Sequence, residues 1–170
     1  ASWLQQAYVK AGDPSGSDSF GTAVATDGES LVIGATGEAS CATGVDGDGS
    51  DHGCTQAGAA YVFIRSAATW SQQAYLKAGN TDARDGFGDS VAIDGDSILV
   101  GASAEDSCTA NDPADNACSG AGAAYAFVRA GTAWSQDAYL KAGNAGVGDA
   151  FGIRVQLSDG VAVIGAMYED

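Results

Sequence analysis

The stretch from Phe20 to Ala35 reads FGTAVATDGESLVIGA, and two close copies of it follow in the chain. The second copy, Phe87 to Ala102, reads FGDSVAIDGDSILVGA, and the third, Phe151 to Ala166, reads FGIRVQLSDGVAVIGA. In every copy a Phe-Gly pair is followed 14 positions later by a Gly-Ala pair. Such constant spacing is typical of a tandem repeat, in which each copy forms one supersecondary unit that stacks on its neighbours.

Each repeat predicts two β-hairpins. The runs 20–25 and 31–35 are rich in β-forming residues and are separated by Asp27-Gly28-Glu29, which is a tight-turn signal. Further along, residues 59–65 and 70–77 alternate bulky residues with polar or small ones, as a strand with two different faces does. Little in the sequence indicates helix. We therefore predict an all-β fold of tandem four-stranded antiparallel blades, as in a β-propeller.

The repeated motifs resemble the FG-GAP repeat of integrin α-subunit-type β-propellers and their bacterial extracellular relatives. The motif residues are Phe20-Gly21, Phe87-Gly88 and Phe151-Gly152, together with the Gly-Ala pairs that follow each of them. The resemblance covers essentially the whole chain. It implies an extracellular propeller that is not an enzyme and that is used for adhesion or ligand display. We expect this chain to have an adhesive or structural, assembly-forming role.

Two departures from the family pattern concern the turns. The residue after Gly-Ala is typically Pro in the family, and here it is Thr36, Ser103 or Met167. Integrin-type blades often carry a cation loop between their first two strands, but here that connection is as short as Asp27-Gly28-Glu29. So short a turn cannot supply the six to eight oxygens that Ca²⁺ takes. We therefore do not expect the family's calcium site there.

The repeats divide the chain into four segments. Residues 1–19 correspond to the last strand of a preceding blade and a linker, 20–86 and 87–150 to two complete blades, and 151–170 to the first two strands of a further blade. A closed ring takes at least four blades, so this arrangement predicts unpaired β edges. We expect the edges to pair with further copies of the chain, in an oligomer or filament, or with the rest of a longer chain.

The four cysteines lie where the repeats differ in length. Cys41 and Cys54 are 13 positions apart and Cys108 and Cys118 are 10 apart, whereas the second cysteine precedes the next Tyr by 7 positions in both repeats. The length difference therefore lies entirely between paired cysteines. This predicts disulfides Cys41–Cys54 and Cys108–Cys118 and an extracellular or cell-surface location. Free thiols are the alternative, and a zinc site with His52 is disfavoured because the second loop has no His.

The charge of the chain disfavours nucleic acid as a partner. The sequence has seven Lys and Arg and 22 Asp and Glu, which gives a net charge of −15. A charge of this sign repels a phosphate backbone. No apolar run approaches the roughly 18 residues of a membrane span. The surplus carboxylates are interpreted as solvated surface, with capture of Ca²⁺ as the alternative.

The candidate metal ligands are aspartates on loops. Asp46, Asp48 and Asp51 alternate with glycine or serine inside the first Cys loop, and they are the first candidates for Ca²⁺, with a solvated loop tip as the alternative. A second set stands two residues before each Phe-Gly pair, namely Asp18, Asp85 and Asp149. For this set we predict a hydrogen bond to backbone amides of the entering loop, and cation binding is the alternative.

Catalytic motifs are lacking, so the sequence indicates a protein that is not an enzyme. The single His, His52, lies in a Gly-rich stretch, and neither Gly-x-Ser-x-Gly nor His-Glu-x-x-His occurs. Trp3, Trp70 and Trp134 occupy one place in the repeat, which favours packing in or between blades. Sugar stacking on these rings is the alternative, and with it a lectin-like module that binds a glycan or another extracellular ligand.

Overall fold

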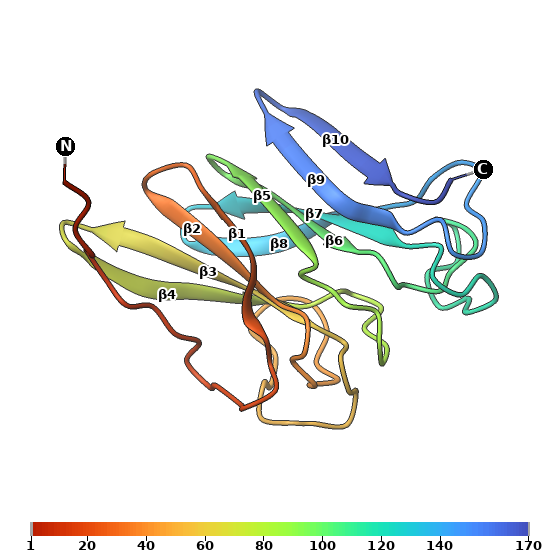
Figure 1. The fold of residues 1–170 in the computed structure, drawn as a ribbon, viewed down its shortest axis with the longest axis horizontal. Coiled ribbons are helices and arrows are strands. Elements are labelled where there is room, and N and C mark those ends of the chain that lie inside the picture. The colour runs from red at the N-terminus through yellow and green to blue at the C-terminus, as the bar shows by residue number, and fades with distance from the viewer. Residues whose placement is uncertain (1, 170) are drawn as a thin grey trace.

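The computed structural model describes residues 2–169, and all regular structure in them is β-strand (Figure 1). The strands are β1 (Phe20–Thr26), β2 (Ser30–Ala35), β3 (Ala59–Ser66), β4 (Thr69–Leu76), β5 (Ser90–Asp94), β6 (Ser97–Ala102), β7 (Ala123–Ala130), β8 (Ala133–Leu140), β9 (Phe151–Ser158) and β10 (Val161–Ala166). Strands β1 to β4 form the first blade, β5 to β8 the second blade, and β9 with β10 the third, two-stranded blade. All neighbouring strands are antiparallel, so the predicted all-β fold of four-stranded blades is confirmed.

The blades stack on one another through apolar side chains. Because successive residues of a strand point to opposite faces of its sheet, Val32 of β2 belongs to the core between the first and second blades, and Ile33 belongs to a separate core on the other face of the first blade. Between the second and third blades, Leu99 of β6 is buried against Val155 and Ile164 of the third blade. Strands β1, β5 and β9 lie side by side (Figure 1).

The two repeated motifs meet between blades. In the second blade Gly88 follows Phe87 with a φ of 95°, a left-handed conformation that glycine adopts without steric cost. Its carbonyl oxygen would lie 2.0 Å from a β-carbon added at Gly34, so no side chain fits there. Gly152 approaches Gly101 in the same way, at 1.9 Å. The Phe-Gly pair of each later blade therefore docks on the Gly-Ala pair of the blade before it.

The N-terminal segment differs from the sequence expectation. Residues 2–19 form no strand, although Trp3 to Lys10 matches the sequence of a fourth strand, because no other strand of the described residues lies beside that segment. Trp3 is 99% exposed, so packing of this tryptophan is not observed, whereas Trp134 at the equivalent place is 5% exposed. The segment packs on the first blade from Val9 onward, where Val9 and Ala11 join the outer core of that blade.

Candidate functional site

The longer connections all lie at one end of the blades. Tight turns join β1 to β2, β3 to β4, β5 to β6, β7 to β8 and β9 to β10 at the other end, which we call the turn face. Because consecutive strands run antiparallel, the connections 36–58, 77–89, 103–122 and 141–150 gather at the opposite end (Figure 1). We call this end the loop face.

Both disulfides lie on the loop face. Cys41 is bonded to Cys54 and Cys108 to Cys118, with Cα atoms 5.0 and 4.9 Å apart, and these are the two pairs that the repeat lengths predict. An aspartate braces each closed loop, since Asp51 accepts a hydrogen bond from the Cys41 N–H at 3.1 Å. Asp115 does the same for Cys108, at 3.2 Å. The two loops are thus built alike in spite of their different lengths.

The three carboxylates predicted to bind calcium all contact their own loop or its neighbouring strand. Asp46 accepts a hydrogen bond from the Tyr75 N–H at 2.8 Å, and Asp51 holds the disulfide loop as described above. Asp48 accepts from both the N–H and the hydroxyl of Ser50, and these bonds lower the pKa of Asp48. Residues 2–169 contain no group of three His, Cys, Asp or Glu side chains that could hold a metal ion. Calcium binding by this loop stays a prediction.

The aspartates that precede the Phe-Gly pairs are buried and brace the entering loops. Each accepts a hydrogen bond from the N–H three residues earlier, with pairs Ser15 to Asp18, Asp82 to Asp85 and Gly146 to Asp149 at 2.6, 3.0 and 2.6 Å. This is the structural role predicted for them. The pKa of Asp85 is raised to about 7, mainly by burial; the hydrogen bond from the Asp82 N–H opposes the shift, and the nearby Glu105 carboxylate adds to it.

A buried ion pair lies beneath each disulfide loop. The ammonium of Lys77, the residue after β4, donates to Glu38 Oε2 at 2.6 Å and to the Gly58 carbonyl oxygen at 2.7 Å. In the second blade Lys141 donates to Glu105 Oε2 at 2.8 Å. The side chains of both pairs are at most 4% exposed. Desolvation lowers the pKa of Lys77, and Glu38 opposes that shift by pairing with its charged form.

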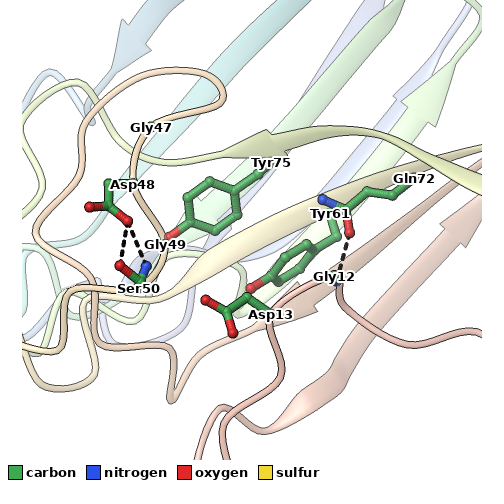
Figure 2. Close-up of a pocket in the computed structure, with 9 residues that line it drawn as sticks. All are labelled: Gly12, Asp13, Gly47, Asp48, Gly49, Ser50, Tyr61, Gln72 and Tyr75. Carbon is green, nitrogen blue, oxygen red and sulfur yellow. Dashed lines mark hydrogen bonds between the residues drawn. The ribbon is translucent and has the colours of Figure 1, made fainter.

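A pocket of about 280 Å³ opens on the loop face between the first disulfide loop and the N-terminal segment. Figure 2 shows the Tyr61 hydroxyl pointing toward the Asp13 carboxylate, and the Tyr75 hydroxyl close to Gly49. The pocket is lined by Gly12, Asp13, Gly47, Asp48, Gly49, Ser50, Tyr61, Gln72 and Tyr75. The rings of Tyr61 and Tyr75 are in contact, with centroids 5.2 Å apart.

The Tyr75 hydroxyl lacks a hydrogen-bond partner in the part of the chain that the structure describes, although it is buried. Glu38 and Ser40 lie near enough to affect its pKa, but neither meets the geometry of a hydrogen bond with it. Burial is the main cause that raises the pKa of Tyr75, and Glu38 adds to it. The hydroxyl is therefore protonated at neutral pH, and its oxygen is free to accept a hydrogen bond.

Sequence reasoning placed one pocket residue, Asp48, among its candidates and missed Asp13, Tyr61 and Tyr75. It also missed the ion pairs, because Glu38 and Lys77 are 39 residues apart and each looks like an ordinary surface charge. The three repeats, compared with one another, do contain a sign of these ion pairs. A Glu follows each Gly-Ala pair by three residues, as in Glu38, and a Lys follows each Trp by seven, as in Lys77.

The comparisons with known proteins follow the same repeat boundaries. A family model described as FG-GAP repeat matches residues 3–63, 70–127 and 134–170. The chain belongs to the FG-GAP repeat family. A search of the curated proteins gave no match. Each FG-GAP match begins at a Trp of the repeat, so one sequence unit runs from the fourth-strand position of one blade into the next blade.

The FG-GAP blades carry no helix that could cross a membrane within residues 2–169. Their repeat unit spans the junction where the Phe-Gly pair of one blade docks on the Gly-Ala pair of another. The connections that differ in length between the copies, 36–58 and 103–122, both lie on the loop face.

Proposed function

We propose that this FG-GAP chain is an extracellular, non-catalytic module that adheres to a partner through its loop face. The observation that carries the proposal is the asymmetry between the two ends of the blades. Tight turns close one end, whereas both disulfides and the loops that differ between repeats lie at the other. Loops held by a rigid scaffold are where binding residues concentrate in proteins.

The disulfides support the extracellular location, because such bonds form and persist in oxidising compartments. The non-catalytic character is supported by what the buried charged groups do. Lys77 and Lys141 are engaged in ion pairs with Glu38 and Glu105, and Asp85 braces a loop. These contacts account for the buried groups as parts of the scaffold.

A retention assay tests the adhesive role. Microspheres coated with the chain are passed over immobilised extracellular proteins and over cells, and the fraction retained under flow is measured. The loop-face variant Asp48→Asn with Asp112→Asn is compared with the turn-face variant Glu29→Gln with Asp159→Asn, which removes the same number of charges. We expect lower retention for the loop-face variant alone. Retention equal to that of uncoated spheres for the unaltered chain contradicts the proposal.

The lectin-like alternative draws less support from the tryptophans. Trp134 is buried and donates a hydrogen bond from its indole N–H to Gln73 at 2.8 Å, so its ring serves the junction between the first two blades. Trp70 is half-buried in the first blade. A glycan array probed with the chain distinguishes the two functions, because specific retention of a glycan by the loop face favours the lectin.

A further inference from the structure

In the second blade, the region that corresponds to this pocket contains the side chain of Asn80. There the amide of Asn80 accepts a hydrogen bond from the Tyr125 hydroxyl at 2.9 Å. The same amide donates from Nδ2 to the Pro113 carbonyl oxygen at 2.8 Å and to Glu105 Oε1 at 3.3 Å. Tyr139 also donates to Glu105 Oε1, at 2.7 Å. The Asn80 amide therefore fills this place and supplies the N–H donors that the surrounding oxygens need.

The first blade has a carboxylate where the second has that amide. Asp13 follows Lys10 by three residues, as Asn80 follows Lys77 and Asn144 follows Lys141. The third position keeps the amide function, since Asn144 Nδ2 donates to Glu169. A carboxylate carries no N–H, so Asp13 cannot donate as the two asparagines do.

The oxygens that Asn80 satisfies have counterparts around Asp13. Ser40 donates its hydroxyl to the Asp48 carbonyl oxygen at 2.6 Å, as Ser107 does to that of Asp112 at 3.0 Å. When the two loops are aligned on these hydrogen bonds, Gly49 of the first loop corresponds to Pro113 of the second. Glu38 takes the place of Glu105, and it accepts hydrogen bonds from the Ser40 N–H and from Lys77, whereas Glu105 accepts from four donors. The first blade thus keeps the acceptors and lacks the donor.

Tyr75 supplies an independent sign that a group is missing. It is 6% exposed, its hydroxyl has no hydrogen-bond partner in residues 2–169, and it lines the pocket (Figure 2). Its counterpart Tyr139 is satisfied by Glu105. An unsatisfied buried hydroxyl costs about 1–3 kcal/mol, so native structures rarely leave one without a partner.

We propose that the pocket binds a primary ammonium group at the end of a short alkyl chain, as in a lysine side chain of a protein partner. The ammonium lies beside the Asp13 carboxylate, supplies N–H donors of the kind that the Asn80 amide supplies in the second blade, and donates to Asp13 and to the Tyr75 hydroxyl oxygen. Asp48 at the rim adds a second negative charge. The Tyr61 and Tyr75 rings contact the alkyl stem and attract the cation through their faces. The inference rests on the proposed function in treating the partner as a protein bound by the loop face.

An ammonium fits this arrangement better than a bare metal ion. Ca²⁺ takes six to eight oxygens, and no trio of His, Cys, Asp or Glu in residues 2–169 is arranged to hold a metal. The volume of about 280 Å³ also exceeds what one ion fills, whereas an alkyl chain occupies it. An ammonium has three donors and no acceptor, which matches a pocket of acceptors.

The test uses n-butylammonium and Nα-acetyl-lysine amide as probes, titrated at pH 7 into the full chain and followed by NMR. We expect saturable shifts of the Tyr61 and Tyr75 ring resonances. Asp13→Asn supplies N–H donors of its own, as Asn80 does, and is expected to weaken binding about tenfold or more, because a charged hydrogen bond is lost. The turn-face variant Glu29→Gln is the control and is expected to bind as the unaltered chain does.

Tyr75→Phe separates a binding role from a structural one. Its hydroxyl has no partner in the free chain, so we expect unfolding stability to be kept or raised while the affinity for n-butylammonium falls. Absence of saturable shifts, unchanged affinity in Asp13→Asn, or shifts produced by Ca²⁺ or a neutral sugar in place of the amines overturns the proposal. The titration uses the chain alone, so it succeeds or fails independently of the retention assay.

Discussion

At the scale of single residues, the most consequential contacts are the buried ion pairs under the loop face. Glu38 with Lys77 and Glu105 with Lys141 place two charged groups of each blade where water does not reach them. Such a pair adds little stability over an apolar replacement of both partners, but the loss of one partner leaves the other charge buried alone. Each pair also ties the loop after the second strand to the end of the fourth strand.

Replacing Lys77 by Met is therefore expected to destabilise the chain by about 3–5 kcal/mol, because Glu38 stays buried without its partner. Chemical denaturation measures the effect. Lys10→Met is the matched control, since Lys10 has the same place in the repeat but is exposed, and we expect a change within about 0.5 kcal/mol. Equal effects of the two substitutions contradict the role of the pair.

The raised pKa of Asp85 predicts that the free energy of unfolding depends on pH. Its pKa in the folded chain is about 7, against 3.8 for an ordinary aspartate. Between these values the folded chain keeps the proton and the unfolded chain has lost it, so this group's contribution to stability is lost as pH rises from about 4 to about 7. Asp85→Asn keeps the acceptor for the Asp82 N–H but does not titrate.

The free energy of unfolding of Asp85→Asn is accordingly expected to fall less over that pH range, and the variant gains up to about 4 kcal/mol over the unaltered chain at pH 8. Urea denaturation at a series of pH values measures both curves. Parallel curves contradict the raised pKa of Asp85.

At the scale of elements, the junction between blades depends on the approach of two backbones. The Phe-Gly carbonyl of one blade lies where a side chain on the Gly-Ala strand of the previous blade would stand. A second tie comes from a bulge in the pairing of β3 with β4, where Gln73 has no partner residue on β3 and its side chain reaches Trp134 of the second blade. A bulge re-aims a side chain in this way without ending the sheet.

Gly101→Ala is expected to destabilise the chain by about 1–3 kcal/mol or more, because its β-carbon would lie 1.9 Å from the Gly152 carbonyl oxygen. Gly165→Ala is the matched control. It has the same place in the third blade, and its β-carbon would lie 3.8 Å from the nearest atom. Thermal unfolding of the two variants measures the difference, and similar melting temperatures contradict docking of the motifs.

The sequence predicted the elements well because their signals are local. The Asp-Gly turns and the alternation along 59–65 give strands within a residue or two of those observed, and the paired cysteines follow from loop lengths. The site was predicted less well. Its residues come from the N-terminal segment, two strands and a loop, which are far apart in the sequence. The substitution of Asp13 for the asparagine found at position 80 can be interpreted only from the structure, which shows Tyr125 and Glu105 hydrogen-bonded to the Asn80 amide.

At the scale of the whole molecule, residues 2–169 form an open stack of two four-stranded blades and one two-stranded blade. Within the described part of the chain the outer strand β10 pairs with β9 alone, and its Val161 and Val163 are more than half exposed. An open strand edge beside exposed valines invites pairing with another chain. Further copies of the chain, or another part of a longer chain, are the partners that we propose for it.

Native mass spectrometry tests this pairing. We expect species larger than the 16.8 kDa of a single chain, with a share that grows with concentration. Substituting Val163 by Lys places a charge beside the open edge and is expected to shift the population toward the monomer. A single 16.8 kDa species at all concentrations, with freely exchanging amides in β10, contradicts pairing through this edge.

The two disulfide loops suggest a use beyond the native sequence. Their lengths differ by three residues, yet their paired Cα atoms are 5.0 and 4.9 Å apart, and the strands below them keep the same register. The scaffold therefore sets the spacing of the two ends of the insert, and in the first loop it also holds residues 44–46 against the end of β4. A foreign peptide grafted between Cys41 and Cys54 has to keep this spacing and these contacts, and the chain is then a candidate frame for presenting cyclic epitopes.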